Sequence, residues 1–223
     1  QDLTNFHKPY TALIRNKIAP ILLNNTVTGR NISLVISQDE FKRALNVIHG
    51  EIFGVAKKIN IAIFGHGTVG GTLISQILES TKNIEKRKGI KLNVFAIANS
   101  KKVLLNKFGI SENWKATLED KGQDYKVEDI IAYAKEHHLE NLIAIDNTAS
   151  STFIENYISL AENSFDLISS NKVANTVSFD FYKTLRKVLK ENQKEYLYET
   201  NVGAGLPLID TIKLLHLSGE NIT

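Results

Sequence analysis

The sequence of 223 residues contains no cysteine, no methionine and only three prolines. Because there is no cysteine, disulfide bonds, thiolate nucleophiles and cysteine-based zinc sites are all excluded. No apolar run approaches the roughly 18 residues that a membrane-spanning helix requires, and no signal-peptide pattern opens the chain. We therefore expect a cytoplasmic protein without a membrane partner.

A strong excess of one charge is also absent. Lysine and arginine number 27 and aspartate and glutamate 24, which gives a net charge of +3. The basic residues are scattered rather than gathered in a stripe, so we expect no nucleic-acid partner. The sequence has no initiator methionine, and nothing signals the end of its last element before Thr223. We therefore expect it to be a piece of a longer protein.

The order of apolar and turn-forming segments predicts three parts. The pattern over residues 1–55 predicts a small α+β unit. Residues 201–223 are expected to begin a further part, which contains a helix. Between them, residues 56–200 alternate strands with helices, which predicts a mostly parallel α/β sheet covered on both faces. Within that part, residues 101–126 are expected to be irregular and anchored by Trp114. The predicted strands of the sheet are residues 59–64, 92–98, 142–145, 165–168 and 196–198.

The α+β unit is expected to end in a helix. Ser37 to Glu40 forms a capping-box pattern, in which a hydroxyl is followed three residues later by a carboxylate. The residues behind it recur at helical spacing, which predicts one buried face. That face would contain Phe41, Ala44, Leu45, Ile48 and Ile52.

Three glycines form a G-x-G-x-x-G motif between a predicted strand and a predicted helix. The first glycine permits a tight turn, the second lets a diphosphate approach the backbone, and the third lets the helix pack closely on the strand. The motif predicts a Rossmann-like, doubly wound dinucleotide-binding fold; a plain glycine-rich turn is the alternative. His66, inside the motif, is expected to face solvent without a catalytic role. The expected cofactor contacts are Gly65, Gly67, Thr68, Val69 and Gly70.

The end of the second strand of the sheet indicates which dinucleotide binds. NAD enzymes usually place an acid there to bind the ribose 2′-hydroxyl. This strand ends instead in Asn99, Ser100 and Lys101, followed by Lys102. Amide, hydroxyl and ammonium groups favour a 2′-phosphate, so we expect NADP(H), with NAD as the alternative cofactor. Two lysines on an ordinary solvated loop would give the same pattern.

Polar residues follow the next two strands. Asp146 and Thr148 end one of them, and Asn171 and Lys172 follow the other. Ligands bind outside the carboxyl ends of such strands, so these groups are expected near the nicotinamide, with Thr148 in contact with the cofactor. Asp146 and Ser150 would serve equally as helix-capping residues. Lys172 is the candidate catalytic residue, and a surface lysine is the alternative interpretation.

The last motif is the glycine-rich run at residues 199–207. Its glycines and Pro207 exclude a regular strand and favour a tight loop with exposed carbonyl groups. Such a loop can bind a hard cation through backbone oxygens. A rigid connection between two parts of the protein is the alternative.

Taken together, these segments resemble homoserine dehydrogenase over about residues 57–223. The string Tyr-Glu-Thr-x-Val-Gly-Ala-Gly-Leu-Pro, at residues 198–207, is specific to that family. The matching segments, in the family's order, are residues 65–71, 98–100, 146–150, 171–172 and 199–207.

The resemblance implies an NADP-dependent interconversion of L-homoserine and L-aspartate 4-semialdehyde, in threonine and methionine biosynthesis. The family's conserved lysine, which contacts nicotinamide and substrate, corresponds to Lys172. A homodimer or a higher homo-oligomer is expected, and residues 201–223 would begin the substrate-binding domain. The family's substrate carboxylates and proton-transferring lysine would lie beyond Thr223. The family also holds a sodium ion through backbone oxygens, which correspond to those of Glu199, Val202, Ala204 and Leu206.

The first 55 residues resemble the end of an ACT regulatory domain of an aspartokinase. Asn31-Ile32-Ser33, followed by a strand and a capped helix, carries this shorter resemblance. An aspartokinase fused to a homoserine dehydrogenase would account for both parts. Residues 24–29 depart from the usual serine-rich pattern, which puts an effector site there in doubt. Aspartate-semialdehyde dehydrogenase requires a cysteine nucleophile and is excluded. A nucleotide- or amino-acid-binding regulatory module without turnover remains as the alternative function.

Overall fold

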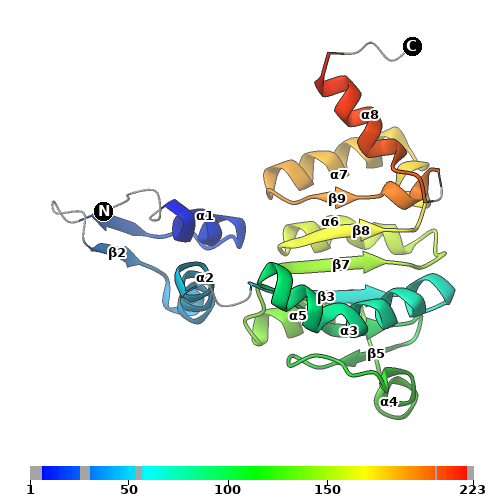
Figure 1. The fold of residues 1–223 in the computed structure, drawn as a ribbon, viewed down its shortest axis with the longest axis horizontal. Coiled ribbons are helices and arrows are strands. Elements are labelled where there is room, and N and C mark those ends of the chain that lie inside the picture. The colour runs from blue at the N-terminus through cyan, green and yellow to red at the C-terminus, as the bar shows by residue number, and fades with distance from the viewer. Residues whose placement is uncertain (1–6, 26–30, 54–56, 204, 220–223) are drawn as a thin grey trace.

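The structure is a computed structural model that describes residues 7–25, 31–53, 57–203 and 205–219. A small N-terminal unit lies beside a larger unit built on one sheet (Figure 1). The strands of the sheet are β3 (Lys57–Phe64), β4 (Ile90–Ala98), β5 (Lys102–Leu105), β6 (Gln123–Asp124), β7 (Leu142–Asp146), β8 (Phe165–Ser169) and β9 (Tyr196–Leu197). The helices after β3 are α3 (Thr68–Lys88), α4 (Trp114–Lys121), α5 (Val127–Glu136), α6 (Asn156–Glu162), α7 (Phe179–Glu191) and α8 (Leu208–Leu217).

The sheet has the strand order β6-β5-β4-β3-β7-β8-β9. Strands β4, β3, β7, β8 and β9 are parallel, and β5 and β6 join antiparallel at one edge. From the central β3 the chain proceeds to β4 on one side and later to β7 on the other. The direction of winding therefore reverses at β3, and a crevice at such a reversal is where open α/β sheets bind ligands. The predicted Rossmann-like sheet is confirmed.

Both faces of the sheet are covered, because the side chains of β3 alternate between two cores. Ile61 and Ile63 pack in a cluster with residues of α3 and α4. Ala62 and Phe64 pack in a second cluster with residues of α5, α6 and α7. Burial on both faces explains why β3 is an almost continuous apolar run rather than an alternating one. Among the described residues, no helix is both long and apolar enough to cross a membrane.

The expectation of an irregular stretch at residues 101–126 is wrong in part. That stretch contains β5, α4 and β6. The expected anchor is confirmed, because Trp114 is only 3% exposed and packs in the apolar cluster formed with residues of β3 and α3. The short elements depend on these contacts: α4 has only 8 residues, and a helix of that length is marginal without tertiary packing.

The N-terminal unit has a small core of its own. It consists of α1 (His7–Arg15), β1 (Leu22–Asn25), β2 (Ile32–Val35), the short turn η2 (Gln38–Glu40) and α2 (Phe41–Phe53). Strands β1 and β2 pair antiparallel. The core contains Leu13, Ile18, Ala44 and Val47.

Two details of the helix predicted in this unit are wrong. The side chain of Ser37 makes no capping hydrogen bond, and Glu40 instead forms an ion pair with Arg43 at 2.7 Å. Ala44 is buried as expected, whereas Phe41 and Leu45 are 57% and 54% exposed. The predicted face is therefore shifted around the helix, and it leaves an apolar strip of α2 uncovered.

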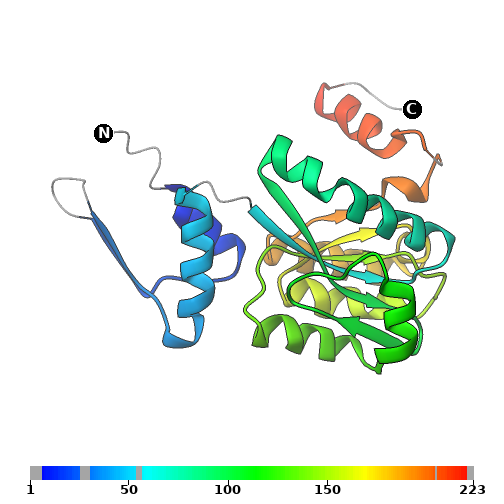
Figure 2. The same cartoon turned by 60° about the horizontal axis from the view of Figure 1, so that its bottom comes forward.

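Hydrogen bonds join the N-terminal unit to the larger unit, which lies to one side of it (Figure 2). The amide of Asn141 donates to Asn16 Oδ1 at 3.1 Å, and Lys194 Nζ donates to the carbonyl of Arg15 at 3.1 Å. Lys17 Nζ donates to the carbonyl of Glu162. All three contact the amino-terminal side of the sheet, away from the carboxyl ends of its strands.

The packing of α4 predicts a large cost for removing its tryptophan. We expect Trp114→Ala to lower the free energy of unfolding by about 3–5 kcal/mol, the usual range for truncating a buried aromatic residue. Phe108→Ala is the control, because Phe108 is 81% exposed and its loss should cost less than about 0.5 kcal/mol. Urea unfolding followed by circular dichroism measures both. Equal effects of the two substitutions would contradict the packing of α4 on the sheet.

Candidate functional site

The glycine loop joins β3 to α3 and is held by contacts that exclude larger residues. Gly65 has φ +84°, a conformation that favours glycine, and a β-carbon there would lie 2.9 Å from the backbone of Asn147. A β-carbon on Gly70 would lie 2.0 Å from the carbonyl oxygen of Gly65. The first and third glycines are therefore needed for the close approach of helix and strand, as the motif predicts.

The second glycine serves a different purpose, because a β-carbon on Gly67 would meet no atom within 4 Å. Gly67 is the residue before α3, and it provides no side-chain cap for the helix. The first N–H groups of a helix have no partner within it, so those from Thr68 to Gly70 are available to a ligand. Thr68 and Val69 are exposed, which leaves the start of the helix open. An anionic group can bind there, at the positive end of a helix of 21 residues.

Backbone hydrogen bonds continue past the strands and hold their carboxyl ends together. The amide of Gly65 donates to the carbonyl of Ala98 at 2.8 Å, which links β3 to β4. The backbone amide of Asn147 donates to the backbone carbonyl of Phe64 at 2.8 Å. The backbone amide of Ser170 donates to the backbone carbonyl of Asp146 at 2.9 Å. The segments that were singled out in the sequence therefore form one continuous edge around the glycine loop.

Asp146, at the end of β7, is a buried carboxylate with three donors. Its Oδ1 accepts from the amide of Thr148 at 2.7 Å. Its Oδ2 accepts from the hydroxyl of Tyr157 at 2.7 Å and from Asn171 Nδ2 at 3.1 Å. Burial, and then the charge of Asp146, raise the pKa of Tyr157, so its hydroxyl keeps its proton and remains a donor. The alternative interpretation of Asp146 as a helix-capping residue is wrong, because Thr148 does not belong to a helix.

Asn171 connects this carboxylate to the loop that carries Lys172. Asn171 is buried, its Nδ2 also donates to the carbonyl of Ser150 at 2.8 Å, and its amide donates to Ser169 Oγ at 2.9 Å. Lys172, the next residue, has an exposed side chain at the start of η4 (Val173–Asn175). The backbone of Lys172 is thus fixed by a buried network while its ammonium group is free to meet a ligand.

The sequence did not identify Tyr157 as part of the site. Tyr157 belongs to the apolar face of a predicted helix, where an aromatic residue is ordinarily core. The hint was available in β8, which ends in a polar Ser169 that is only 1% exposed. The Oγ of Ser150 accepts from the amides of Thr152 and Phe153 at 3.3 and 3.1 Å, just before η3 (Phe153–Glu155), although the residue that precedes this helix directly is Thr152.

The end of β4 is built as a tight turn without an acid. Asn99 Oδ1 accepts from the amides of Lys101 and Lys102 at 2.8 and 2.7 Å. Its carbonyl accepts from the hydroxyl of Tyr125 at 2.8 Å. Ser100 and Lys101 are exposed at the tip of this turn, whereas Lys102 is the first residue of β5. The groups expected to contact the ribose are therefore at the sheet edge that carries the glycine loop.

The environment of His66 differs from the sequence-based expectation of a solvent-facing residue. The imidazole is partly buried and packs edge-on against Trp114, with ring centroids 5.2 Å apart. Its Nε2 is buried and makes no hydrogen bond to any described residue.

The glycine-rich run begins with η5 (Glu199–Asn201) and leads into α8. The carboxylate of Glu199 accepts from the amides of Ile209 and Asp210, at 2.8 and 3.1 Å, and so caps that helix. The carbonyls of Glu199 and Leu206 each accept one amide, at 3.4 and 2.9 Å, which leaves each oxygen a second lone pair for a cation. Of the predicted sodium ligands, Val202 is exposed and Ala204 lies outside the described residues. The sodium site therefore stays a prediction.

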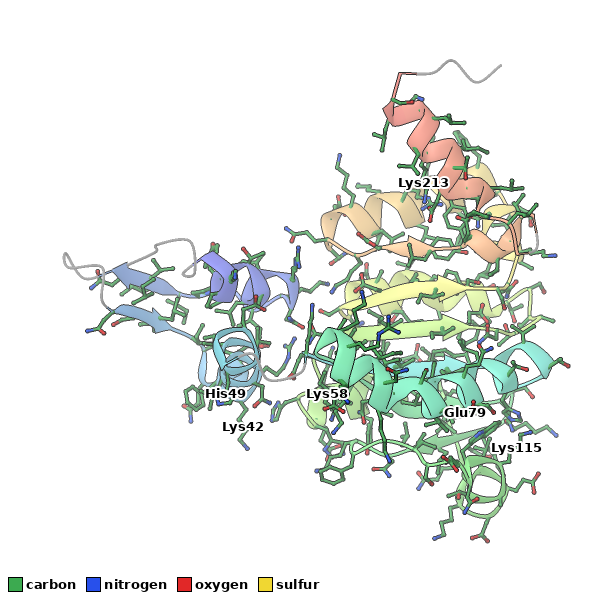
Figure 3. All side chains as sticks on the ribbon, viewed as in Figure 1. Lys42, His49, Lys58, Glu79, Lys115 and Lys213 are labelled. Carbon is green, nitrogen blue, oxygen red and sulfur yellow. The ribbon has the colours of Figure 1, made fainter. Side chains whose placement is uncertain are left out.

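A cavity of about 620 Å³ lies elsewhere in the described structure. It lies between the N-terminal unit and the start of β3, where Lys58 and His49 are found (Figure 3). The glycine loop follows the other end of β3, so this cleft is remote from the expected cofactor. The geometry of the loop, rather than cavity size, identifies the candidate site.

The family model and the relatives that match this chain in sequence point to the same protein family. Residues 65–199 match the family model described as "Homoserine dehydrogenase, NAD binding domain". The chain is 37% identical over 217 residues to the bifunctional aspartokinase/homoserine dehydrogenase of Buchnera aphidicola, covering 96% of this chain and 26% of that protein. It is 32% identical over 214 residues to the Haemophilus influenzae protein of the same name, with coverage of 96% and 26%. The chain thus spans about a quarter of the length of these relatives.

Solved structures agree on the fold. The homoserine dehydrogenase of Thermoplasma acidophilum aligns over 73% of this chain and 49% of its own, with a TM-score of 0.59 and 17% identity, which supports the fold alone. A hyperthermophilic archaeal homoserine dehydrogenase mutant in complex with NADPH aligns over 70% of this chain and 48% of its own. Its TM-score is 0.56, at 25% identity.

The two kinds of glycine in the loop predict different effects of a single methyl group. Gly70→Ala should lower both stability and nucleotide affinity, because the β-carbon collides with the backbone of Gly65. Gly67→Ala should leave the unfolding midpoint nearly unchanged but weaken nucleotide binding, because its β-carbon occupies the space that a diphosphate needs. Thermal unfolding and NADPH fluorescence titration separate the two effects. Unaltered NADPH affinity in Gly67→Ala would contradict the placement of the diphosphate.

Proposed function

Because this chain belongs to the homoserine dehydrogenase family, whose NAD-binding domain it carries, we propose that it serves the NADP-dependent interconversion of L-homoserine and L-aspartate 4-semialdehyde. The observation that carries the proposal is the meeting of the glycine loop and the Asn171–Lys172 turn at one edge of the sheet, beside the reversal at β3. The aspartokinase fusion of the two relatives supports a bifunctional parent protein. A regulatory binding module without turnover would not require an exposed lysine held by a buried network.

In the direction of oxidation, the substrate loses a hydride from the carbon that bears its hydroxyl, and the hydroxyl proton leaves. A bound nicotinamide would supply the acceptor for that hydride. Lys172 is the proposed catalytic residue: its ammonium group orients the substrate oxygen and stabilises negative charge that develops there. The proposed contacts to the cofactor are the amides of the glycine loop together with Asn99, Ser100, Lys101, Thr148 and Lys172.

The N-terminal unit has a separate small core, which supports the proposal that residues 1–55 are an ACT-like regulatory part. The proposal that residues 201–223 begin a substrate-binding or dimerisation domain is supported by α8. Its Leu214 and Leu217 are 67% and 81% exposed, as expected of a helix that packs against further protein. A sodium ion on the carbonyls of the glycine-rich run, and a homodimer, belong to the same proposal.

The missing acid at the end of β4 predicts a preference between cofactors. We expect NADPH to bind the chain at least about tenfold more tightly than NADH, because no carboxylate opposes the 2′-phosphate and Lys101 is exposed beside it. Lys101→Ala should weaken NADPH binding and leave NADH binding nearly unchanged. Fluorescence titration with both reduced nucleotides measures this. Equal affinities, or tighter NADH, would refute the charge argument.

The activity itself is tested by supplying homoserine and NADP⁺ to an active protein that contains this chain and recording NADPH absorbance. Lys172→Ala should reduce turnover by roughly tenfold or more. The melting temperature should stay within a few degrees, since an exposed substitution usually costs under about 0.5 kcal/mol. Lys190→Ala, an exposed lysine of α7, is the control. Nucleotide binding without hydride transfer would favour the regulatory module, and unchanged turnover in Lys172→Ala would remove that residue from catalysis.

A further inference from the structure

The cleft of about 620 Å³ between the N-terminal unit and the start of β3 has a strongly uneven charge. The acids in its lining are Glu51 and Glu140. The basic side chains that line it, apart from histidines, are Lys8, Arg15, Lys57, Lys58 and Lys107. With the histidines neutral, five positive and two negative charges give the cleft a net charge of +3, as large as that of the whole sequence. Charges that are scattered along the chain thus meet in one place.

These five cations reach the cleft from both units. Lys8 and Arg15 belong to α1 of the N-terminal unit. Lys57 and Lys58 begin β3, and Lys107 lies in the turn after β5. Figure 3 shows Lys58 at the end of the larger unit that faces α2. None of the five forms an ion pair with a carboxylate of the described residues. Like charges on the two sides of the cleft repel each other, so an anion between them would stabilise the contact of the two units.

A network of buried amides holds the side of the cleft that belongs to the sheet. Asn60 and Asn93 are buried partners on the neighbouring strands β3 and β4. Asn93 Nδ2 donates to Asn60 Oδ1 at 2.8 Å and to the carbonyl of Lys107 at 3.2 Å. Asn60 Nδ2 donates to the carbonyl of Glu140 at 2.6 Å. The network thus fixes the backbones of two charged lining residues while it leaves their side chains free for a ligand.

Lys58 is half-buried beside this network and lacks an ion pair. Its Nζ donates to the carbonyl of Lys107 at 3.2 Å, which uses one of its three N–H donors. Burial lowers the pKa of this ammonium group, and the charge of Glu140 opposes that shift only in part. Burial also raises the pKa of the Glu140 carboxyl, so both groups are destabilised in their charged forms. A partly buried ammonium group without an ion pair is unfavourable, so an anion that reaches Nζ would be stabilised there.

We propose that this cleft binds a small molecule with two or more negative charges, a phosphate ester or a di- or tricarboxylate, and that the bound anion links the N-terminal unit to the larger unit. The volume of the cleft lies within the range of about 300–1,000 Å³ that is usual for small-molecule sites. Lysines bind such groups as point charges, and Arg15 can donate two parallel hydrogen bonds to one of them. The inference does not depend on the proposed function, because the cleft is remote from the glycine loop.

The binding test uses inorganic pyrophosphate and citrate as probes, titrated into the chain by calorimetry at low salt. The probe that binds more tightly identifies the anionic group as phosphate or carboxylate. We expect Lys58→Gln and Arg15→Gln each to weaken its binding by about three- to tenfold, because each removes one charge that faces the anion. The double substitution should weaken it further. Lys42→Gln is the control, because Lys42 is an exposed lysine of the N-terminal unit that does not line the cleft.

Hydrogen exchange tests whether the anion links the two units. The bound probe should slow exchange of the amides of α1, because an element held by an additional contact opens less often. This protection should be lost in Lys58→Gln, although Lys58 belongs to the other unit. Slower exchange confined to the start of α3 would place the probe on the glycine loop and would overturn the inference.

Three further results would overturn the inference: binding of neither probe, undiminished binding in both Lys58→Gln and Arg15→Gln, or an equal loss in Lys42→Gln, which would show attraction to net charge alone. Each of them would leave the proposed function standing. NADPH affinity should be unchanged in Lys58→Gln, and its loss there would place the dinucleotide in the cleft and contradict both. If Lys58→Gln lowers the unfolding midpoint, Lys57→Gln replaces it, because Lys57 lines the same cleft and is exposed.

Discussion

Gly70 and Gly65 meet so closely that a β-carbon on Gly70 would lie 2.0 Å from the carbonyl oxygen of Gly65. This contact fixes where α3 begins relative to the end of β3. Because Gly65 also contacts the backbone of Asn147, the same turn sets the spacing between β3 and the segment after β7. The open helix start, the turn after β4 and the loop with Lys172 are all positioned by that spacing. Backbone packing, rather than side-chain contacts, thus sets the positions of these segments.

Asp146 gives the second half of the site its rigidity. A buried carboxylate is costly unless donors surround it, and here Thr148, Tyr157 and Asn171 provide them. Asn171 precedes Lys172 directly, so the network that compensates the buried charge also fixes the backbone of the proposed catalytic lysine. Such prior positioning of a charged group is what electrostatic catalysis requires.

Much of this arrangement could be predicted from the sequence, because glycine spacing and strand-end residues report local constraints. The three glycines, the acid-free end of β4 and Asn171-Lys172 all lie at the edge that was expected. The elements within residues 101–126 could not be predicted, since α4 depends on burying Trp114 rather than on its own helical periodicity. The partners of Tyr157, and the contact of His66 with Trp114, join residues far apart in the chain. Such tertiary contacts leave no periodic signal.

The proposed function requires a dinucleotide to lie across the carboxyl end of the sheet. A crystal structure of the chain with NADPH tests this most directly. It should show the diphosphate on the amides from Thr68 to Gly70, the 2′-phosphate beside the turn at Ser100 and Lys101, and the nicotinamide toward Lys172. Nucleotide density in the cleft by Lys58, or an adenosine end that does not reach the turn after Asn99, would contradict the account.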